Sequence, residues 1–377
     1  MEPFKNIYNI QALEKIANAI YKLDNSFEKS KFIKNTKKDL DRLELKERVN
    51  LITQNLHLHL NGNYKENINL LTKTLSNDKD HLTKEWSNND HHVEGLNGFY
   101  AWPIAHYIDL YGNKDITTSL KAIKEITKRF TGEFAIRSYI NRNPARVYKE
   151  LYKWTKDKNH HVRRLVSEGT RPLLPWAIRV QLTDNLLLEN IKLLTILKDD
   201  SSQYVRRSVA NHLNDISKID RTLAISTCKK WSQKKGTCTK LIRHATRTLL
   251  KAGDKEALKL NGINPSAKIK ITAAKIDKKK IQEGDCLTLS FTIKNERSAS
   301  ESLLINYIIH YLKKNGSYSE KVFNIKQTLI KGKDTKLVSK MIPFKKVTTR
   351  KHYSGDHYIE IQINGRRSDK KCFTLQV

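Results

Sequence analysis

Apolar residues recur three and four positions apart through the first two thirds of the chain. Near the start they fall at Ile7, Ile10, Leu13, Ile16, Ala17 and Ile20. This spacing places them on one face of an α-helix. Short polar stretches, such as Asn61–Asn63 and Gly112–Asn113, interrupt the pattern. Up to about Leu260 we therefore expect one helix after another.

After Pro265 the pattern changes to strict alternation of apolar and polar residues. Alternating runs cover residues 268–271, 287–293 and 358–363, and turn residues such as Asn364-Gly365 bound them. About seven short strands without an intervening helix are typical of an antiparallel β-sandwich of immunoglobulin type. The chain is therefore predicted to be multidomain, with an all-α part at residues 1–262 and an all-β sandwich at 266–377.

The helical part contains an internal repeat. The segment Asp157–Val166 matches Asp200–Val209, and both copies contain Val-Arg-Arg. The two copies are offset by 43 residues, and a weaker copy follows at Leu241–Ala245. Periods near forty residues are typical of HEAT-type helical pairs, which stack into a solenoid with a concave groove. We therefore predict an all-α HEAT-like repeat solenoid before the sandwich.

The arginines of this repeat allow two interpretations. In HEAT stacks an Asp at a turn and an Arg on the second helix often tie neighbouring repeats together. One arginine of each Val-Arg-Arg is then structural, and the other is available to bind phosphate. The sequence does not decide which arginine has which role.

Composition adds a strong positive charge to this picture. The chain has 71 Lys and Arg residues against 39 Asp and Glu residues, a formal net charge of +32, and both parts are basic. Nucleic acid is the obvious partner, because cationic side chains release counterions from a phosphate backbone. A proteome generally rich in Lys and Asn is the alternative explanation.

Other classes of site and location receive little support. The four cysteines form no Cys-x-x-Cys pair, and the histidine pairs lack ligand spacing, so we expect no metal and no cofactor. The chain has no long apolar run and no signal-peptide pattern at its start. We expect a monomer in the cytoplasm, away from membranes and associated with the bacterial nucleoid through DNA.

Three acidic residues lie within or beside the arginine-rich segments, namely Glu133, Glu168 and Asp215. Carboxylates repel a polyanion, so a protein that only bound phosphates would gain nothing from them. Each acid also has an ordinary interpretation. Glu133 could favour a helix N-terminus, Glu168 could form a surface ion pair with Arg164 or Arg171, and Asp215 could cap a helix. Their joint placement in consecutive repeats favours chemistry on a cation.

Four segments of the helical part carry a resemblance to a known family. They are residues 96–112, 130–140, 160–177 and 204–218. These segments resemble the AlkC branch of DNA alkylation repair proteins, which are HEAT-like-repeat DNA glycosylases related to AlkD. The resemblance covers most of residues 1–260. Some members of the branch also carry a C-terminal immunoglobulin-like domain, in agreement with the predicted sandwich.

The resemblance implies an activity and a set of residues. It implies a monofunctional glycosylase that excises N3-alkylated bases, above all 3-methyladenine, from double-stranded DNA; whether 3-methylcytosine is also excised stays open. The catalytic carboxylates would be Glu133, Glu168 and Asp215, and Trp176 would contact the lesion. The candidate phosphate-binding residues are Arg163, Arg164, Arg171, Arg206, Arg207, Arg243 and Arg247.

The expected chemistry explains why acids would stand in a basic frame. A base alkylated at N3 is cationic and leaves as a neutral molecule, so its departure needs no general acid. The costly species is the sugar oxocarbenium ion, which a nearby carboxylate stabilises, while a second carboxylate positions water. The basic loops at Lys278–Lys280, Lys345-Lys346 and Arg366-Arg367 are candidates for further DNA contacts. A non-enzymatic HEAT scaffold that binds nucleic acid or an acidic protein is the alternative.

Overall fold

The computed structural model describes residues 3–77, 94–233, 239–347 and 350–377. The chain divides into two compact units, residues 1–215 and 216–377. The first is all helical, and the second combines short helices with a β-sandwich. This order confirms the predicted fold class of helical repeats followed by an immunoglobulin-like domain.

The first unit is a stack of antiparallel helices. Its α-helices are α1 (Ile10–Tyr21), α2 (Lys29–Leu40), α3 (Leu45–His59), α4 (Tyr64–Lys73), α5 (Trp102–Tyr111), α6 (Ile116–Ile126), α7 (Ala135–Arg142), α8 (Pro144–Trp154), α9 (His160–Gly169), α10 (Asp184–Leu197) and α11 (Gln203–Ile216). The 3₁₀ turns η1 (Phe4–Ile7) and η3 (Gly98–Ala101) precede α1 and α5.

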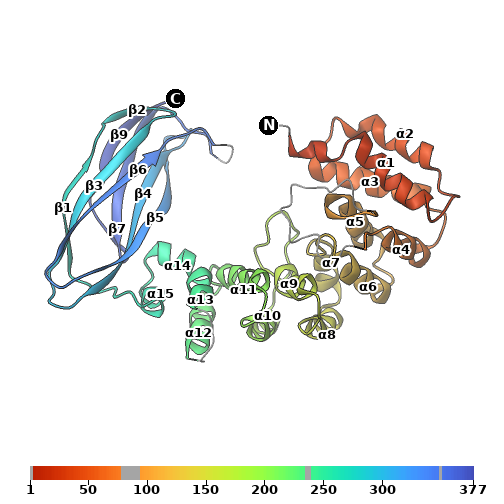
Figure 1. The fold of residues 1–377 in the computed structure, drawn as a ribbon, viewed down its shortest axis with the longest axis horizontal. Coiled ribbons are helices and arrows are strands. Elements are labelled where there is room, and N and C mark those ends of the chain that lie inside the picture. Colours follow the sequence, from red (N-terminus) through yellow and green to blue (C-terminus); the bar gives the residue numbers. More distant parts are fainter. Residues whose placement is uncertain (1–2, 78–93, 234–238, 348–349) are drawn as a thin grey trace. The chain divides into compact units, whose positions relative to one another are not determined.

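The repeat that the sequence indicated forms the core of this stack. The two Val-Arg-Arg copies fall on α9 and α11, and each helix begins three residues after an aspartate at the preceding turn. In Figure 1, α7, α9 and α11 follow one another in one row, and α8 and α10 form a second row. The first valine and the valine four residues later in each copy, Val162 and Val166 or Val205 and Val209, are buried. These pairs lie one helical turn apart and therefore fill the space between the rows.

Local sequence explains where these helices begin. Asn159 caps α9 by accepting a hydrogen bond from the His161 amide at 2.8 Å, and Thr183 caps α10 through the Leu186 amide at 3.3 Å. Side-chain oxygens at these positions satisfy amides that have no partner within the helix. Pro144 begins α8, where its missing amide hydrogen is tolerated.

The second unit begins with four short helices and continues as the sandwich. The helices are α12 (Arg221–Ser232), α13 (Thr239–Ala245), α14 (Arg247–Ala252) and α15 (Lys255–Leu260). The strands are β1 (Ile269–Ile276), β2 (Lys280–Gln282), β3 (Cys286–Asn295), β4 (Glu301–Leu312), β5 (Tyr318–Ile330), β6 (Thr335–Pro343), β7 (Gly355–Ile363), β8 (Arg366–Arg367) and β9 (Lys371–Gln376).

Two sheets face each other across the sandwich core. One has the order β1-β3-β6, and the other has the order β2-β9-β7-β4-β5, with β8 paired to β7. All pairings are antiparallel except that of β2 with β9. Alternate residues such as Phe291 on β3, Ile305 on β4 and Ile361 on β7 point into the core between the sheets. This alternation is the pattern from which the sequence predicted a sandwich.

The last helices pack against the sandwich. Leu249, Leu250 and Leu258 form a second apolar cluster with Leu304 of β4. The backbones of Gly253 and Gly365 also touch, since a Cβ atom built on Gly253 would lie 2.6 Å from the Cα atom of Gly365. The change from helix to strand falls between Leu260 and Ile269, near the predicted boundary. The compact units divide earlier, however, so the domain limits 1–262 and 266–377 remain a prediction.

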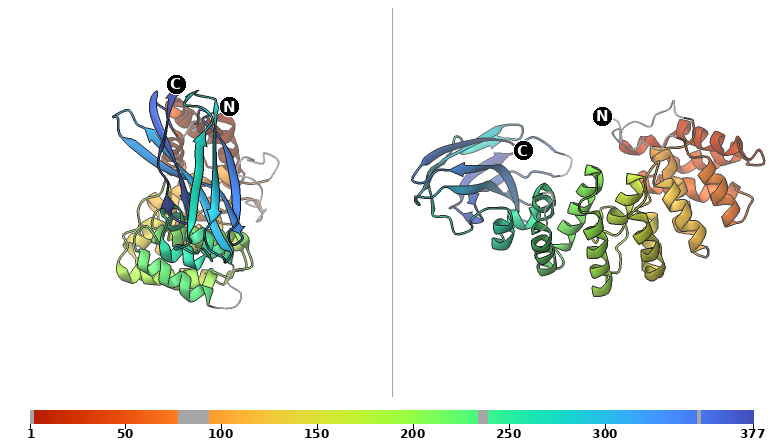
Figure 2. Two further views of the ribbon diagram at one scale, coloured as in Figure 1. Left: turned by 90° about the vertical axis from the view of Figure 1, so that its left-hand side faces the viewer. Right: turned by 60° about the horizontal axis from the view of Figure 1, so that its bottom comes forward.

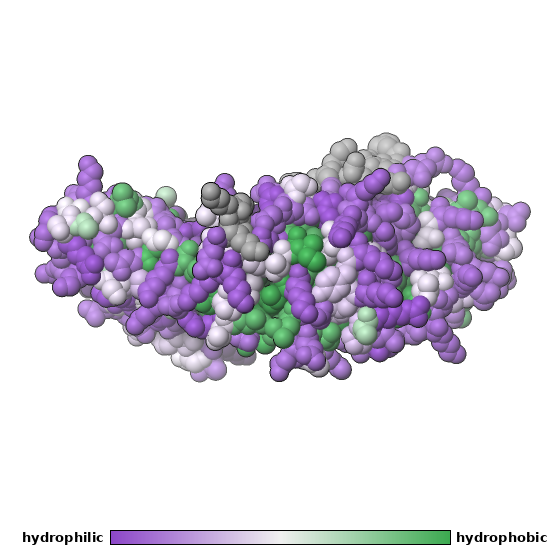
Figure 3. Space-filling view, turned by 90° about the horizontal axis from the view of Figure 1, so that it is seen from below, coloured by the Kyte–Doolittle hydropathy of each residue, from purple (hydrophilic) through white to green (hydrophobic). Residues whose placement is uncertain are grey.

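Figure 2 shows the paired helices and the two sheets from two further directions. Figure 3 shows one face of the molecule, which is mostly hydrophilic and is broken by small apolar areas. Among the described residues, no helix is both long enough and apolar enough to span a bilayer.

Candidate active site

The three predicted acids lie in one row of alternating charges. Arg164 Nη1 is 2.5 Å from Glu133 Oε2, and its Nη2 is 3.4 Å from Glu168 Oε1. Arg171 Nη1 is 2.6 Å from the same Glu168 oxygen, and its Nε is 2.9 Å from Asp215 Oδ2. The order is therefore Glu133, Arg164, Glu168, Arg171, Asp215. We call this set the charge row.

Each acid is held by its own element. Glu133 stands just before α7, where Thr131 Oγ1 donates to its Oε2 at 2.8 Å. Glu168 occupies the last turn of α9 and accepts a hydrogen bond from Ser208 Oγ of α11 at 2.5 Å. Asp215 lies in the last turn of α11. Three successive elements of one row thus supply the three carboxylates.

The acids are largely removed from solvent. Glu133, Glu168 and Asp215 are exposed by 8, 5 and 2%. The pair between Glu168 and its arginines is therefore a buried one, unlike the exposed surface pair that was the ordinary interpretation. Burying charges costs free energy that their mutual attraction often fails to recover. Such clusters are common at functional sites.

The electrostatics of the row favour an ionised Glu168. Burial alone would raise the pKa of Glu168, but Arg164 and Arg171 outweigh that effect and hold its pKa below 4.5. The same two acids, Glu133 and Glu168, raise the pKa of Arg164 although burial opposes this. At neutral pH Glu168 is therefore an anion and cannot donate a proton.

An aromatic cavity of about 370 Å³ opens beside the charge row. Its lining includes Glu133, Glu168, Trp102, Phe130 and Phe134, together with Trp176. The Trp102 ring stacks on Phe130 and Phe134, with centroids 5.8 and 5.4 Å apart. Trp102 is buried. The cavity thus combines aromatic faces with carboxylates, both of which attract a cation.

Trp176 is the exposed aromatic residue of this cavity. It lies in the loop 170–183 between α9 and α10, which we call the Trp176 loop, and it is 64% exposed. Its φ angle is +65°, a left-handed conformation that costs free energy for a bulky residue. Lys46 of α3 donates a hydrogen bond to its carbonyl oxygen. Strained residues that neighbours hold in place are frequent at functional sites.

The two arginines of each repeat copy have different surroundings. Arg163 makes two hydrogen bonds to Asp200, at 2.6 and 2.9 Å, and Arg206 bonds the backbone carbonyls of Asp200 and Ser201. Arg163 therefore ties its repeat to the next one, whereas Arg206 holds the turn that precedes its own helix. The second arginines are Arg164, which belongs to the charge row, and Arg207, which is exposed. Within the described part of the chain, Arg207 forms no ion pair.

The remaining predicted phosphate-binding arginines are also engaged. Arg171 belongs to the charge row. Arg243 contacts Gln327 of β5, and Arg247 donates to the His244 carbonyl at 2.6 Å, both in the second unit. The structure thus brings Arg164 and Arg171 to the acids. Whether any of the seven arginines binds phosphate remains a prediction.

Two polar residues of the site were missed by sequence reasoning. Ser208 occupies the repeat position where the other copy has Leu165, so a hydroxyl in an apolar position was the available signal. Arg137 lies on α7 four residues after Glu133 and is fully buried. It stands beside apolar residues, Ile136 and Tyr139 among them, in a short helix. A charge within an apolar helix face was the signal in that case.

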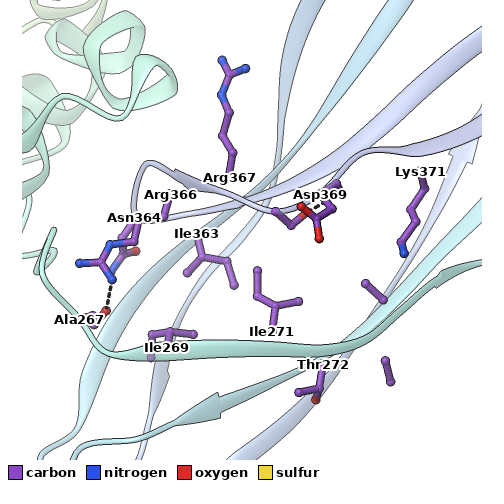
Figure 4. A pocket seen from close by; sticks show the side chains of 13 residues that line it. Ala267, Ile269, Ile271, Thr272, Ile363, Asn364, Arg366, Arg367, Asp369 and Lys371 are labelled. Carbon is purple, nitrogen blue, oxygen red and sulfur yellow. Dashed lines mark hydrogen bonds between the residues drawn. The ribbon is translucent and has the colours of Figure 1, made fainter.

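The sandwich contains a larger cavity of about 540 Å³. Figure 4 shows it between β1 and the β7–β8 hairpin, with Ile269, Ile271 and Ile363 on its wall and Arg366 bonded to the Ala267 carbonyl. No pair of carboxylates lines it. It therefore lacks the features that distinguish the charge row.

One group of described residues has a spacing that could suit a metal ion. The ligand atoms of His310, Glu320 and Glu360 lie within 4.8 Å of one another. Arg367 donates to Glu320 at 2.9 Å and to Glu360 at 3.1 Å. A guanidinium thus already supplies positive charge to both carboxylates, and the group fits a polar network of the sheet better than a metal centre.

Comparison with known proteins gives consistent relatives. Residues 270–377 match the family model described as "Uncharacterised protein YhaZ, C-terminal Ig-like domain". The Bacillus subtilis (strain 168) protein named "Uncharacterized protein YhaZ" is 33% identical over 376 residues and covers 100% of both chains. A structure titled "Pseudomonas fluorescens alkylpurine DNA glycosylase AlkC bound to DNA containing an abasic site analog" is 32% identical, with a TM-score of 0.89 and 100% coverage of both chains.

Proposed function

The chain belongs to the AlkC family of HEAT-like-repeat proteins, and from this premise we propose that it is an alkylpurine DNA glycosylase. It hydrolyses the N-glycosidic bond of N3-alkylated, cationic bases in double-stranded DNA. The first substrate is 3-methyladenine. We include 3-methylcytosine as a second substrate, because it too is cationic and leaves as a neutral base.

The charge row carries this proposal. Two of its carboxylates, those of Glu133 and Glu168, line the aromatic cavity, and Arg164 contacts both. Their negative charge therefore faces the space that the cationic base would enter. A preorganised negative charge in a partly desolvated site stabilises a cation far better than water does. The cation is the base before the bond breaks and the sugar oxocarbenium ion afterwards.

The ionisation of Glu168 supports the restriction to cationic bases. Excision of a neutral purine is assisted by a general acid that protonates the leaving base. The pKa of Glu168 lies below 4.5, so this carboxyl holds no proton at neutral pH. A base that already carries its charge needs none. A carboxylate of the row is then available to position and deprotonate the attacking water.

Arg171 offers a way to couple DNA binding to the acids. Its guanidinium bridges Glu168 and Asp215. We propose that a DNA phosphate draws part of this guanidinium away and frees carboxylate oxygens for the lesion. Arg164 stays between Glu133 and Glu168 and helps to keep Glu168 ionised. The exposed Arg207 binds the duplex backbone, and Trp176 contacts the lesion.

The sandwich contributes further DNA contacts in this proposal. The side chains of Lys278–Lys280, Lys345-Lys346 and Arg366-Arg367 are exposed. Exposed cations attract the phosphate backbone, and the resulting affinity falls as salt rises. No lysine is placed by motif for a Schiff base, so the proposed enzyme releases the base without cleaving the strand.

Release of methylated bases from duplex DNA tests the proposal. Wild-type protein should release 3-methyladenine from DNA treated with a methylating agent. Glu168→Gln should lower the single-turnover rate by at least a hundredfold, because it removes a charge while keeping the shape. Glu150→Gln, a change at an acid paired with Lys153 on α8, is the control and should leave the rate unchanged.

The alternative function has a different outcome. A non-enzymatic scaffold would bind duplex DNA or an acidic protein but release no methylated base. Base release that survives both Glu168→Gln and Asp215→Asn undiminished would overturn the catalytic assignment, although the protein would still be a glycosylase.

A further inference from the structure

Arg137 is a fully buried cation on α7, four residues after Glu133. It is 0% exposed, and Glu133 and Asp215 act on it electrostatically, although it forms no ion pair with a carboxylate among the residues that the structure describes. Burial lowers its pKa to about 10, so it is still a cation at neutral pH. Its Nη2 atom is buried and has no hydrogen-bond partner among the described residues. Such a group needs an explanation, because an unsatisfied buried donor destabilises a fold.

The hydrogen bonds of Arg137 all reach the end of α9 and the Trp176 loop. Its Nη1 donates to the carbonyls of Gly169 and Arg171, both at 2.8 Å. Its Nε donates to the carbonyl of Ile178 at 2.6 Å. The anchored residues stand on both sides of Trp176. One guanidinium group therefore holds the backbone on both sides of Trp176.

Neighbouring contacts complete the attachment. Asn141, one helical turn after Arg137 on α7, donates to the Arg179 carbonyl at 3.0 Å and accepts from the Gln181 amide at 2.9 Å. Lys46 donates to the carbonyl of Trp176 itself. The Trp176 loop has no helix or strand of its own. Its conformation therefore depends on these side-chain contacts with its backbone.

Stability alone does not account for an arginine at this position. An apolar residue of similar length would avoid the desolvation of the cation and of the unpartnered Nη2. Replacement of buried charged groups by apolar ones is often neutral or stabilising. An arginine, however, can satisfy several carbonyls at fixed angles, which an apolar side chain cannot do. The geometry therefore favours a role in placing the segment.

We propose that Arg137 is a positioning residue for the glycosylase reaction. By holding the carbonyls of Arg171 and Ile178, it fixes the backbone from which the Arg171 side chain reaches Glu168 and Asp215, and it keeps Trp176 at the mouth of the aromatic cavity. This proposal rests on the proposed function, since the reaction it serves is the release of the cationic base. Arg137 itself does not touch the substrate.

The matched control is Arg48 of α3. It is also buried, and it also donates to backbone carbonyls, those of Leu43 at 3.0 Å and Tyr8 at 2.8 Å. Arg137→Met should lower the single-turnover rate of 3-methyladenine release by at least tenfold, with little change in duplex affinity. Arg48→Met should keep the wild-type rate at a temperature where the protein is folded.

Two further measurements separate positioning from loss of folding. Amide hydrogen exchange across 170–180 should rise in Arg137→Met and stay at the wild-type level in Arg48→Met. Added guanidinium ion should restore part of the rate of Arg137→Ala, because it can refill the space that the side chain vacates. It should not raise the rate of the wild type or of Arg48→Ala.

The outcomes are distinct. A rate for Arg137→Met within twofold of that of Arg48→Met, or unchanged exchange across 170–180, would overturn the positioning role. Wild-type protein that releases no 3-methyladenine would instead overturn the proposed function, before any variant is compared.

Discussion

At the residue scale, the main feature is that the predicted catalytic acids share their partners. Glu168 contacts both arginines of the charge row, and each arginine contacts two acids. Removing one member therefore changes the surroundings of the others, and the effects of single substitutions will not add. The row is a unit, and its protonation is a property of the whole unit.

The first prediction concerns pH. Because Arg164 and Arg171 hold the pKa of Glu168 below 4.5, the carboxylate is charged from about pH 5.5 to about pH 8. Burial lowers the pKa of His212, which bonds the Ser167 carbonyl, to about 4, so it stays neutral there. The single-turnover rate of base release should be level across this range. A tenfold rise per pH unit would show that a proton donor or acceptor titrates during the reaction.

The lowered pKa of Glu168 also affects the stability of the fold. A carboxyl whose folded pKa is lowered stabilises the fold fully above its ordinary pKa, and this contribution is lost as pH falls through the folded value. The free energy of unfolding of the wild type should therefore fall more steeply below pH 4.5 than that of Glu168→Gln. Denaturant unfolding at several pH values measures both slopes.

The sequence could identify the candidate acids and the two possible partners of Glu168, but not the partners of Glu133 and Asp215. The spacing of Glu133, Glu168 and Asp215 in successive repeats was visible, and so was the abundance of arginine. Which guanidinium would face a carboxylate depends on side-chain directions across neighbouring helices. Arg163 and Arg164 are adjacent in the sequence, yet one pairs with Asp200 and the other with Glu133. Consecutive helical residues point in different directions, and only the packed structure assigns them.

At the element scale, α7 and α9 approach each other closely because of a glycine. A Cβ atom built on Gly169 would lie 2.7 Å from Ile136 Cγ2. Gly169 directly follows Glu168, and Ile136 directly precedes Arg137 on α7. The short separation of these helices is therefore part of the geometry that lets Arg164 reach Glu133.

The second prediction follows from this contact. Gly169→Ala should force α9 away from α7 and destabilise the fold by about 1–3 kcal/mol, as is usual for an overpacked core. Base release should fall further than this loss of stability explains, because Arg164 and Glu133 separate. Gly262→Ala is a useful comparison, since no atom lies within 4 Å of the added methyl group, although its positive φ adds strain. It should lower stability without changing the rate.

The elements themselves were largely predictable, and their limits less so. Alternation predicted strands at 287–293 and 358–363, which lie inside β3 and β7. The Trp176 loop was different, because its path depends on Arg137 and Asn141, which act from another helix. The local pattern of apolar and polar residues does not indicate hydrogen bonds between residues that lie 32 to 41 positions apart in the sequence.

At the scale of the whole molecule, the last helices and the sandwich form one compact unit. Leu304 joins them on one face of β4, while Leu303 points into the sandwich core from the other. The sequence predicted the change of structure near Pro265. It did not indicate that α12–α15 would cluster with the strands, because an apolar helix face does not show which other element will pack against it.

The third prediction tests this unit. Leu304→Ala should destabilise it by about 2–5 kcal/mol, as do other large-to-small changes in a core. Hydrogen exchange should then rise in α14 and α15 as well as in β4. Leu303→Ala, on the opposite face, should raise exchange in the sandwich and leave α14 and α15 protected. Equal effects of the two variants on these helices would show that the cluster does not join them.

Glu133 and Glu168 present carboxylates to the aromatic cavity. A flat organic monocation, such as a methylated imidazolium, should therefore bind there, because aromatic faces and carboxylates both attract a cation. It would act as an inhibitor that slows base release without lowering the affinity for undamaged duplex DNA. The carboxylates that recognise a cationic base would thus also form the binding site of a small-molecule inhibitor.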